Sequence, residues 1–540
     1  MSDFTIDTIK ECSKHDKEIY GFAKIIDKSM CSALTNVVFL TLYGAQSKKD
    51  IAQVLCDRGT FVREFMKVFK DSKLKAFIFQ IDGTSDNVDF IRCMHLNVSF
   101  TGVNNLRDIM PVIYFTTTEW MRSAILIAAD VDVKSGDRIV EVLIDPAGYV
   151  VSELEYTEQG YLEREQRDCK PYKSMTPETI RQRILGQNDP VKIICHANLP
   201  GMESTKYLAN KVLHNVVSSK LQIMEEDLNK YDDKFVFETV KWMLNKSYTK
   251  FYVCQKSFRN YMIASKFDGK HYPLILCKKE DVLPFTKTVT IPRSFLQFVR
   301  AATDNNDIDI IENTLIEIPK EVHALKFTLE IDESNFIFAD VRGLIFNKVS
   351  RLPAQLDAKK VQFPVIGFYG ELSFMYVKDD DDSNFKLLDS WNGKLGKDLY
   401  ISFDEEKPIF FEKAVKKFLC GRKKSVIHDI IKVMSTPPTQ LSSLESFGYT
   451  IFSDENHPVL MIVENFAEEN KGASPAFLMA LLLREHLKEL KMKFGKKPNK
   501  IGFCLFDDFE TGEAKKRVEN GLKESCKMLN GLECSFFEAV

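Results

Sequence analysis

The alternation of hydrophobic and polar positions is clearest near the C-terminal end of the chain. Ser474 followed by Pro475 predicts the start of a helix, because serine caps a helix and proline suits its first position. "IGFCLF" (501–506) predicts a buried strand, and the apolar stripe of a second helix follows at Ala514, Val518, Leu522 and Cys526. "LECSFF" predicts another strand. Helix, strand, helix and strand in this order are typical of a crossover unit in a mixed or parallel sheet.

Short strands are also predicted just upstream of this unit. "PVIGFYGELSFMYV" (364–377), "FKLLDSW" and "DLYISF" have the pattern of a meander. "KDDDDS" lies at its first turn, and four aspartates are of the type that binds calcium. The spacing of an EF-hand loop is absent, so we expect a solvated hairpin tip there and no metal site.

Strand signals dominate the middle of the chain. "YPLILC", "KTVTI" and "LKFTLEIDESNFIFADV" (325–341) alternate or run apolar, with "DESN" as a turn, and predict a small β-sandwich over residues 259–345. "NKVSRLPAQLDAKK" follows it and has the composition of a linker, which we place at 346–363.

The first 258 residues have a mixed α/β pattern. "NVVFLTLYG" predicts a strand, and "TTTEWMRSAIL" begins with the capping-box pair Thr116 and Glu119. "DRIVEVLIDPAGYVVSELEY" (137–156) predicts a hairpin, because its Asp-Pro-Ala-Gly turn places proline where φ near −65° is needed. "PVKIICHANLPG" predicts a strand that leads through a loop into a helix.

Composition excludes several classes of partner. The chain has 540 residues, 44% hydrophobic and 28% charged, with a net charge of −3, so we expect more than one domain, no nucleic-acid partner and no anionic membrane. The longest apolar run, "AFLMALLL", is shorter than the ~20 residues of a membrane span. Twelve cysteines without a CxxC pair, and a polar N-terminus, indicate free thiols and a cytoplasmic location.

Taken together, these segments resemble the seventy-kilodalton heat-shock chaperones, whose ATPase domain has the actin-like fold. "VIGFYGELSFMYV", "SVIHDIIKVM" and "PNKIGFCLFDDFETG" are similar to lobe I of that ATPase. "EIYGFAKII", "NVVFLTLYGAQ" and "VKIICHANLPG" are similar to lobe II, and the predicted sandwich is similar to the peptide-binding β-domain.

The resemblance implies a fold and a segment order. It predicts a two-lobed α/β actin-like ATPase with an additional all-β sandwich, in the order lobe II (1–258), sandwich (259–345), linker (346–363) and lobe I (364–540). This order is that of a circular permutation. "ECSFFEAV" is then expected to continue, in space, into the segment that follows Met1.

The resemblance also implies site residues, and the sequence departs from most of them. The first phosphate hairpin corresponds to Gly370 and Glu371, where a glutamate replaces a threonine and Phe368 replaces an aspartate. The remaining implied positions are Gly44, Ala45 and Gln46 in the second phosphate hairpin, His196 on the adenosine side, and Lys432 and Glu538 as catalytic residues. A carboxylate or the bulky Tyr43 at a phosphate turn opposes anion binding, so we expect neither ATP turnover nor a cofactor, while binding of Mg-ATP without turnover stays open.

The predicted sandwich offers a separate candidate site. Phe295 and Phe298 are candidates for contact with an extended apolar peptide, and the alternative is that both are core aromatics. We therefore expect a catalytically degenerate, chaperone-like protein that binds a protein or peptide partner as a co-chaperone or scaffold. An active ATP-dependent chaperone and a structural protein unrelated to chaperones are the alternatives.

Overall fold

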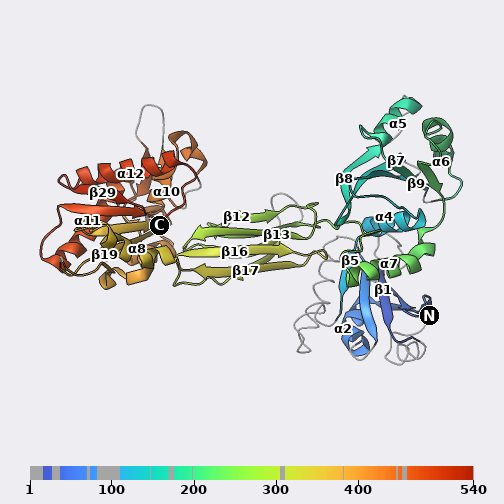
Figure 1. Cartoon of the computed structure of the whole chain (residues 1–540), viewed down its shortest axis with the longest axis horizontal. Coiled ribbons are helices and arrows are strands. Elements are labelled where there is room, and N and C mark those ends of the chain that lie inside the picture. The colour runs from blue at the N-terminus through green and yellow to red at the C-terminus, as the bar shows by residue number, and fades with distance from the viewer. Residues whose placement is uncertain are drawn as a thin grey trace.

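The molecule is elongated, with an α/β body at each end of a β-sandwich (Figure 1). We call these the N-terminal body, the sandwich and the C-terminal body. The computed structural model describes residues 16–26, 37–69, 73–81, 110–145, 148–169, 175–197, 199–303, 310–380, 382–444, 448–452 and 459–538. The mixed α/β character expected from the sequence is confirmed, and it is distributed over several separate sheets.

The first sheet of the N-terminal body has the strand order β3-β2-β1-β4-β5. β1 is antiparallel to β2 and parallel to β4, and β4 is parallel to β5. The strands are β1 (Ile19–Ile26), β2 (Val37–Gly44), β3 (Asp50–Asp57), β4 (Leu74–Gln80) and β5 (Val112–Phe115), with helices α2 (Arg58–Phe69) and α4 (Thr117–Ala128).

The second sheet of this body repeats the same arrangement. Its order is β10-β9-β6-β7-β8, so a three-strand antiparallel meander again continues from its first strand into two parallel strands. The strands are β6 (Arg138–Asp145), β7 (Gly148–Thr157), β8 (Gly160–Cys169), β9 (Lys192–Ala197) and β10 (Leu221–Met224), with α5 (Pro177–Leu185), α6 (Glu203–Tyr207) and α7 (Asp232–Leu244). Both sheets, α4 and α7 contribute to one shared hydrophobic core.

The sandwich consists of two antiparallel sheets, β12-β11-β14-β15 and β13-β16-β17. Its strands are β11 (Asn260–Phe267), β12 (Lys270–Cys277), β13 (Phe285–Pro292), β14 (Gln297–Thr303), β15 (Ile310–Ile316), β16 (Ala324–Ile331) and β17 (Ile337–Leu344). Apolar side chains from both sheets, including Phe298 and Phe327, meet between them.

The C-terminal body contains the same strand order for a third time, β20-β19-β18-β28-β29, with β18, β28 and β29 parallel. The strands are β18 (Val365–Tyr369), β19 (Leu372–Val377), β20 (Lys386–Leu387), β28 (Lys500–Leu505) and β29 (Glu533–Phe537). α11 (Pro475–Phe494) and α12 (Gly512–Lys527) pack on one face. One small sheet of this body consists of β22 (Ile401–Ser402), β23 (Ile409–Phe410) and β24 (Val426–Ile427). A second consists of β25 (Thr450–Phe452), β26 (Leu460–Glu464) and β27 (Asn470–Ala473). The body also contains β21 (Lys397–Asp398), α9 (Glu412–Leu419) and α10 (Ile430–Ser435).

The segment interpreted as a linker is instead a helix. α8 (Asn347–Ala358) covers the second face of the C-terminal sheet, and it buries Val349, Leu352 and Leu356 there. The Tyr376 hydroxyl of β19 also donates a hydrogen bond to the Val349 carbonyl oxygen. A run of charged residues and Pro353 concealed this i, i+3, i+7 apolar stripe.

The expected continuation of "ECSFFEAV" into the N-terminal segment is wrong for the described residues. β29 is hydrogen-bonded to β28, whereas β1 lies between β2 and β4 in a different sheet. In Figure 1, β1 lies in the N-terminal body and β29 in the C-terminal body. β1 is hydrogen-bonded to β2 on one side and to β4 on the other, so neither of its edges is open to β29.

Candidate functional site

The candidate site in the C-terminal body lies at the edge of the sheet where three parallel strands end. Gly370 follows β18, Asp507 lies just beyond β28, and Glu538 follows β29. Because the three strands are parallel, their carboxyl ends meet at one edge of the sheet. Carboxyl ends of parallel strands are the usual position of a ligand site in α/β sheets.

The predicted phosphate turn at this edge is occupied by a side chain of the protein itself. The Gly370 backbone N–H donates to both carboxylate oxygens of Asp507, at 2.9 and 3.1 Å. Gly370 has φ of +52°, and a Cβ built there would lie 2.5 Å from Cβ of Pro292 in the sandwich. Burial raises the pKa of Asp507 to about 6, while the bond from Gly370 lowers it.

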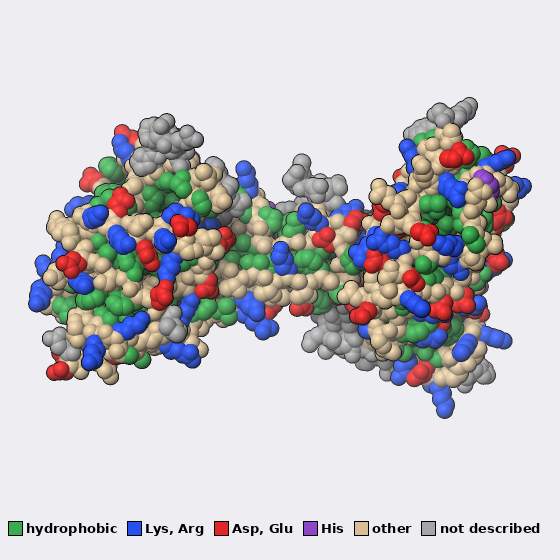
Figure 2. Space-filling view, turned by 45° about the horizontal axis from the view of Figure 1, so that its top comes forward, with side chains coloured by type: hydrophobic (Ala, Val, Ile, Leu, Met, Phe, Trp, Pro, Cys, Tyr) green, Lys and Arg blue, Asp and Glu red, His purple; other side chains and the backbone are tan. Residues whose placement is uncertain are grey.

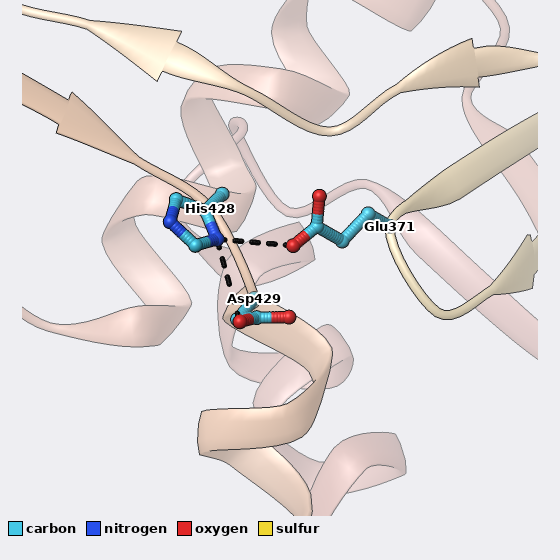
Figure 3. A group of neighbouring side chains, drawn as sticks. All are labelled: Glu371, His428 and Asp429. Carbon is cyan, nitrogen blue, oxygen red and sulfur yellow. Dashed lines mark hydrogen bonds and ion pairs between the residues drawn. The ribbon is translucent and has the colours of Figure 1, made fainter. Parts of the chain in front are cut away.

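Beside this turn lies a cluster of two carboxylates and one imidazole (Figure 3). Glu371 extends from the β18–β19 turn, and His428 and Asp429 lie between β24 and α10. His428 Nδ1 lies 3.0 Å from Glu371 Oε1 and 3.3 Å from Asp429 Oδ2. The three donor atoms lie within 4.8 Å of one another, so the cluster is a potential metal-ligand set.

The ionisation of this cluster is governed by burial and by the mutual charges. Burial alone would lower the pKa of His428, but Glu371 and Asp429 outweigh it and raise it to about 10. Burial and the charge of Asp429 raise the pKa of Glu371 to about 7. Burial opposes ionisation of Asp429 as well, but the bonds and charge of His428 hold its pKa below the usual range.

Aromatic rings enclose the cluster. Tyr400 is stacked on His428, with ring centroids 5.1 Å apart and planes 14° apart. Phe418 and Tyr449 meet the same imidazole edge-on, each with a centroid separation of 5.4 Å. Rings on several sides keep His428 in one orientation and separate it from water.

The two predicted catalytic residues lie at the margin of this site. Lys432 is exposed on α10, where its charge helps to lower the pKa of Asp429. Glu538 is exposed and pairs with Lys515 of α12 at 2.6 Å. The structure therefore places both in the C-terminal body, Lys432 close to the cluster and Glu538 in a surface ion pair.

The second predicted phosphate turn lies in the other body. Asp16 accepts from the Gln46 and Ser47 backbone N–H groups at 2.9 and 3.0 Å, and from the Ser47 hydroxyl at 2.9 Å. The Gly44 and Ala45 N–H groups donate to backbone carbonyl oxygens of the same chain. A Cβ at Gly44 would lie 2.0 Å from the Asp16 carboxylate, so this carboxylate fills the concavity of the turn.

His196, predicted on the adenosine side, lies at the end of β9 and belongs to neither turn. Its Nε2 lies 2.9 Å from the Glu226 carbonyl oxygen, and its Nδ1 is buried without a hydrogen-bond partner among the described residues. The turn at Gly44, the turn at Gly370 and His196 thus lie on three different sheets. They do not converge on one cleft.

The two predicted groove residues of the sandwich have structural contacts. Phe298 is 1% exposed, and its ring centroid lies 4.8 Å from that of Phe327 in the sandwich core. Phe295 packs edge-on against Tyr400 of the C-terminal body at 5.8 Å. Phe298 is therefore a core aromatic, the alternative considered from the sequence, and Phe295 belongs to a contact between the sandwich and the C-terminal body.

Sequence reasoning missed Asp16, Asp507, His428 and Asp429. A signal existed for Asp507, because it follows the strand "IGFCLF" directly, at the carboxyl end where ligand sites form. "VIHDII" places His428 and Asp429 next to each other, but nothing local indicates that Glu371 joins them. Asp16 carries no recognisable signal.

Comparison with family models and with curated proteins gives no match. No helix among the described residues combines the length and apolarity needed to cross a membrane. On the face shown in Figure 2, acidic and basic side chains are interspersed over both bodies, without a surface of a single charge.

Proposed function

We propose that this chain is a chaperone-like protein-binding scaffold that neither binds nor hydrolyses ATP at its predicted phosphate turns. One observation carries the proposal: in each turn a carboxylate of the chain holds the backbone N–H groups that a phosphate would need. A second anion would have to displace that carboxylate and then lie beside it. Like charges at such a distance repel, and a displaced Asp507 would lose its donor.

The proposal assigns the two-lobed, actin-like part of the resemblance to residues 16–258. Two sheets of the same strand order with one shared core support this assignment. The C-terminal body, with the same strand order again, is then a third lobe-like unit. The sandwich between them corresponds to the β-domain of the resemblance.

A calorimetric titration with Mg-ATP tests the absence of nucleotide binding. ATP at 100 times its Kd would stabilise the protein by about 2.7 kcal/mol, which is readily detected as a rise in Tm. We expect no heat of binding and no rise in Tm at millimolar Mg-ATP, with Mg²⁺ alone as the control. Saturable binding would contradict the proposal, and release of phosphate in addition would favour an active ATP-dependent chaperone.

The outer face of the β13-β16-β17 sheet is the surface that best suits a protein partner. It contributes to a hollow of about 500 Å³ whose lining includes Lys326, Glu330, Phe338, Asp340 and Arg342. Phe338 is 45% exposed on β17, which is the edge strand of its sheet. An apolar side chain among alternating charges, beside a sheet edge, suits an extended peptide that adds a strand.

Suppression of aggregation tests the protein-binding part. We expect the full chain to slow the aggregation of a thermally unfolded model enzyme equally with and without Mg-ATP. Phe338→Asp should weaken this effect several-fold, because a charge removes the apolar contact. Leu315→Asp is the matched control, since Leu315 is 60% exposed on the other sheet. Equal activity of both variants would refute the assignment of this face.

A further inference from the structure

The cluster of Glu371, His428 and Asp429 has the spacing of a metal coordination sphere. Zinc bound to histidine nitrogen and carboxylate oxygen at about 2.0–2.1 Å, in tetrahedral geometry, holds its ligand atoms about 3.3 Å apart. The observed separations from His428 Nδ1 are 3.0 Å to Glu371 Oε1 and 3.3 Å to Asp429 Oδ2. Figure 3 shows both carboxylates directed at this same nitrogen from different segments of the chain.

The charges of the cluster also favour a divalent cation. A divalent cation bound to two carboxylates and a neutral imidazole makes the group neutral. The charge of Lys432 acts on Asp429, but the Lys432 side chain is itself exposed. Coulomb attraction is stronger in a desolvated site than in water, so a cation bound by these ligands would be held firmly.

A second layer of contacts orients the ligands. The Tyr400 ring is stacked on His428, and the Tyr400 hydroxyl lies close enough to Glu371 that the carboxylate helps to raise the pKa of Tyr400. Metal ligands in proteins are typically fixed by such outer contacts, which hold the donor atoms in position before the metal arrives. The position of Tyr400 is independent of the distances between the donor atoms of Glu371, His428 and Asp429.

We propose that Glu371, His428 and Asp429 bind a divalent transition metal of the zinc type. His428 contributes Nδ1, each carboxylate contributes one oxygen, and the fourth position is available to water or a small ligand. One nitrogen and two oxygen donors suit Zn²⁺, Co²⁺ and Mn²⁺ better than Ca²⁺ or Mg²⁺, which prefer oxygen alone. The metal would connect the β18–β19 turn with the start of α10.

Cobalt is the most informative probe because its visible absorption reports coordination number and ligand type. The full chain is treated with a chelator, its accessible thiols are alkylated, and it is then titrated with Co²⁺. We expect saturable visible absorption of four- or five-coordinate cobalt at one equivalent, reversed by added Zn²⁺. Six-coordinate spectra, no saturation, or a thiolate charge-transfer band would overturn the proposal.

Variants locate the site. Asp429→Asn and Glu371→Gln should each abolish the saturable absorption, and Tyr400→Phe should weaken Co²⁺ binding about tenfold, the usual loss for an outer contact. Asp404→Asn is the control, because this carboxylate pairs with Lys417 outside the cluster. Unchanged binding in both ligand variants would refute the site, even if the wild-type chain binds cobalt. If one ligand variant fails to fold, the other ligand variant and the wild-type titration still test whether the cluster binds cobalt.

Discussion

Glu141 lies in the middle of β6 and is 1% exposed. Burial raises the pKa of its carboxyl group to about 8, while the charge of Arg122 lowers it and that of Glu163 raises it. Arg122 forms its ion pair with Glu163 and hydrogen-bonds Ser152, and neither Glu141 oxygen has a hydrogen-bond partner among the described residues. Glu141 is therefore protonated in the folded protein at neutral pH.

This residue gives a pH-dependent prediction. The folded protein holds the Glu141 proton up to pH about 8, whereas the unfolded chain releases it near 4.5, so the free energy of unfolding falls as pH rises between these values. Glu141→Gln should remove that decrease. We expect the variant to be more stable than wild type at pH 8 by roughly 4 kcal/mol, and about equally stable at pH 4.5.

Denaturant unfolding at the two pH values measures this difference. Glu165→Gln is the matched control, because Glu165 lies in the same sheet but is exposed and pairs with Arg167. A surface pair of this kind contributes little, so we expect a change within about 0.5 kcal/mol at both pH values. A Glu141→Gln variant that is less stable than wild type at pH 8 would show that Glu141 is ionised.

At the scale of elements, local signals identify helices and turns well. The capping box at Thr116 and Glu119 is confirmed, and the Ser474 hydroxyl accepts from the Phe477 N–H at the start of α11, as the serine–proline pair predicts. The hairpin of β6 and β7 also forms where the Asp-Pro-Ala-Gly turn predicts it. These signals are readable because each acts within a few residues.

α8 shows where local signals fail. Pro353 lies inside this helix, and its first turns carry Lys348 and Arg351, so the segment reads as a linker. Its stability comes from burial of Leu352 and neighbouring apolar residues on a sheet formed by later parts of the chain. Tertiary packing therefore outweighs the unfavourable helix propensity of proline here.

At the scale of the whole molecule, short polar contacts join the sandwich to both bodies. At the N-terminal junction, the Phe258 N–H donates to Asn335 Oδ1 at 2.7 Å, and Asn335 Nδ2 donates to the Lys256 carbonyl oxygen at 3.0 Å. At the C-terminal junction, His323 Nδ1 accepts from the Phe346 N–H, and its Nε2 donates to the Lys394 carbonyl oxygen at 2.6 Å. These contacts make the elongated arrangement a defined one.

A buried ion pair of Arg293 and Asp398 also joins the sandwich to the C-terminal body. Arg293 donates to Asp398 Oδ1 through two nitrogens, at 3.1 and 2.7 Å. Arg293→Met would leave the Asp398 carboxylate buried and unpaired, at a cost of about 3 kcal/mol or more. We expect this variant to loosen the junction, so that small-angle X-ray scattering shows a larger and more variable maximum dimension.

Arg342→Met serves as the control for the scattering experiment, because Arg342 pairs with Asp340 on the surface of the sandwich. Its scattering profile should match that of wild type. Arg293→Met with Asp398→Asn should restore part of the compactness, since the double variant contains no unpaired charge. A wild-type profile for Arg293→Met alone would mean that the apolar contacts around Phe295 and Tyr400 hold the junction by themselves.

The sequence by itself determined the local elements of this protein: the caps, the hairpins, the apolar stripe of α12 and the strand-rich middle segment. It also predicted that Glu371 opposes phosphate binding at its turn. Only the tertiary structure decided which strands share a sheet, that Asp16 and Asp507 fill the two predicted turns, and that Glu371 meets His428 and Asp429. The reason is physical: caps and turns depend on neighbours along the chain, whereas sheet partners and buried charge clusters depend on contacts between residues far apart in sequence.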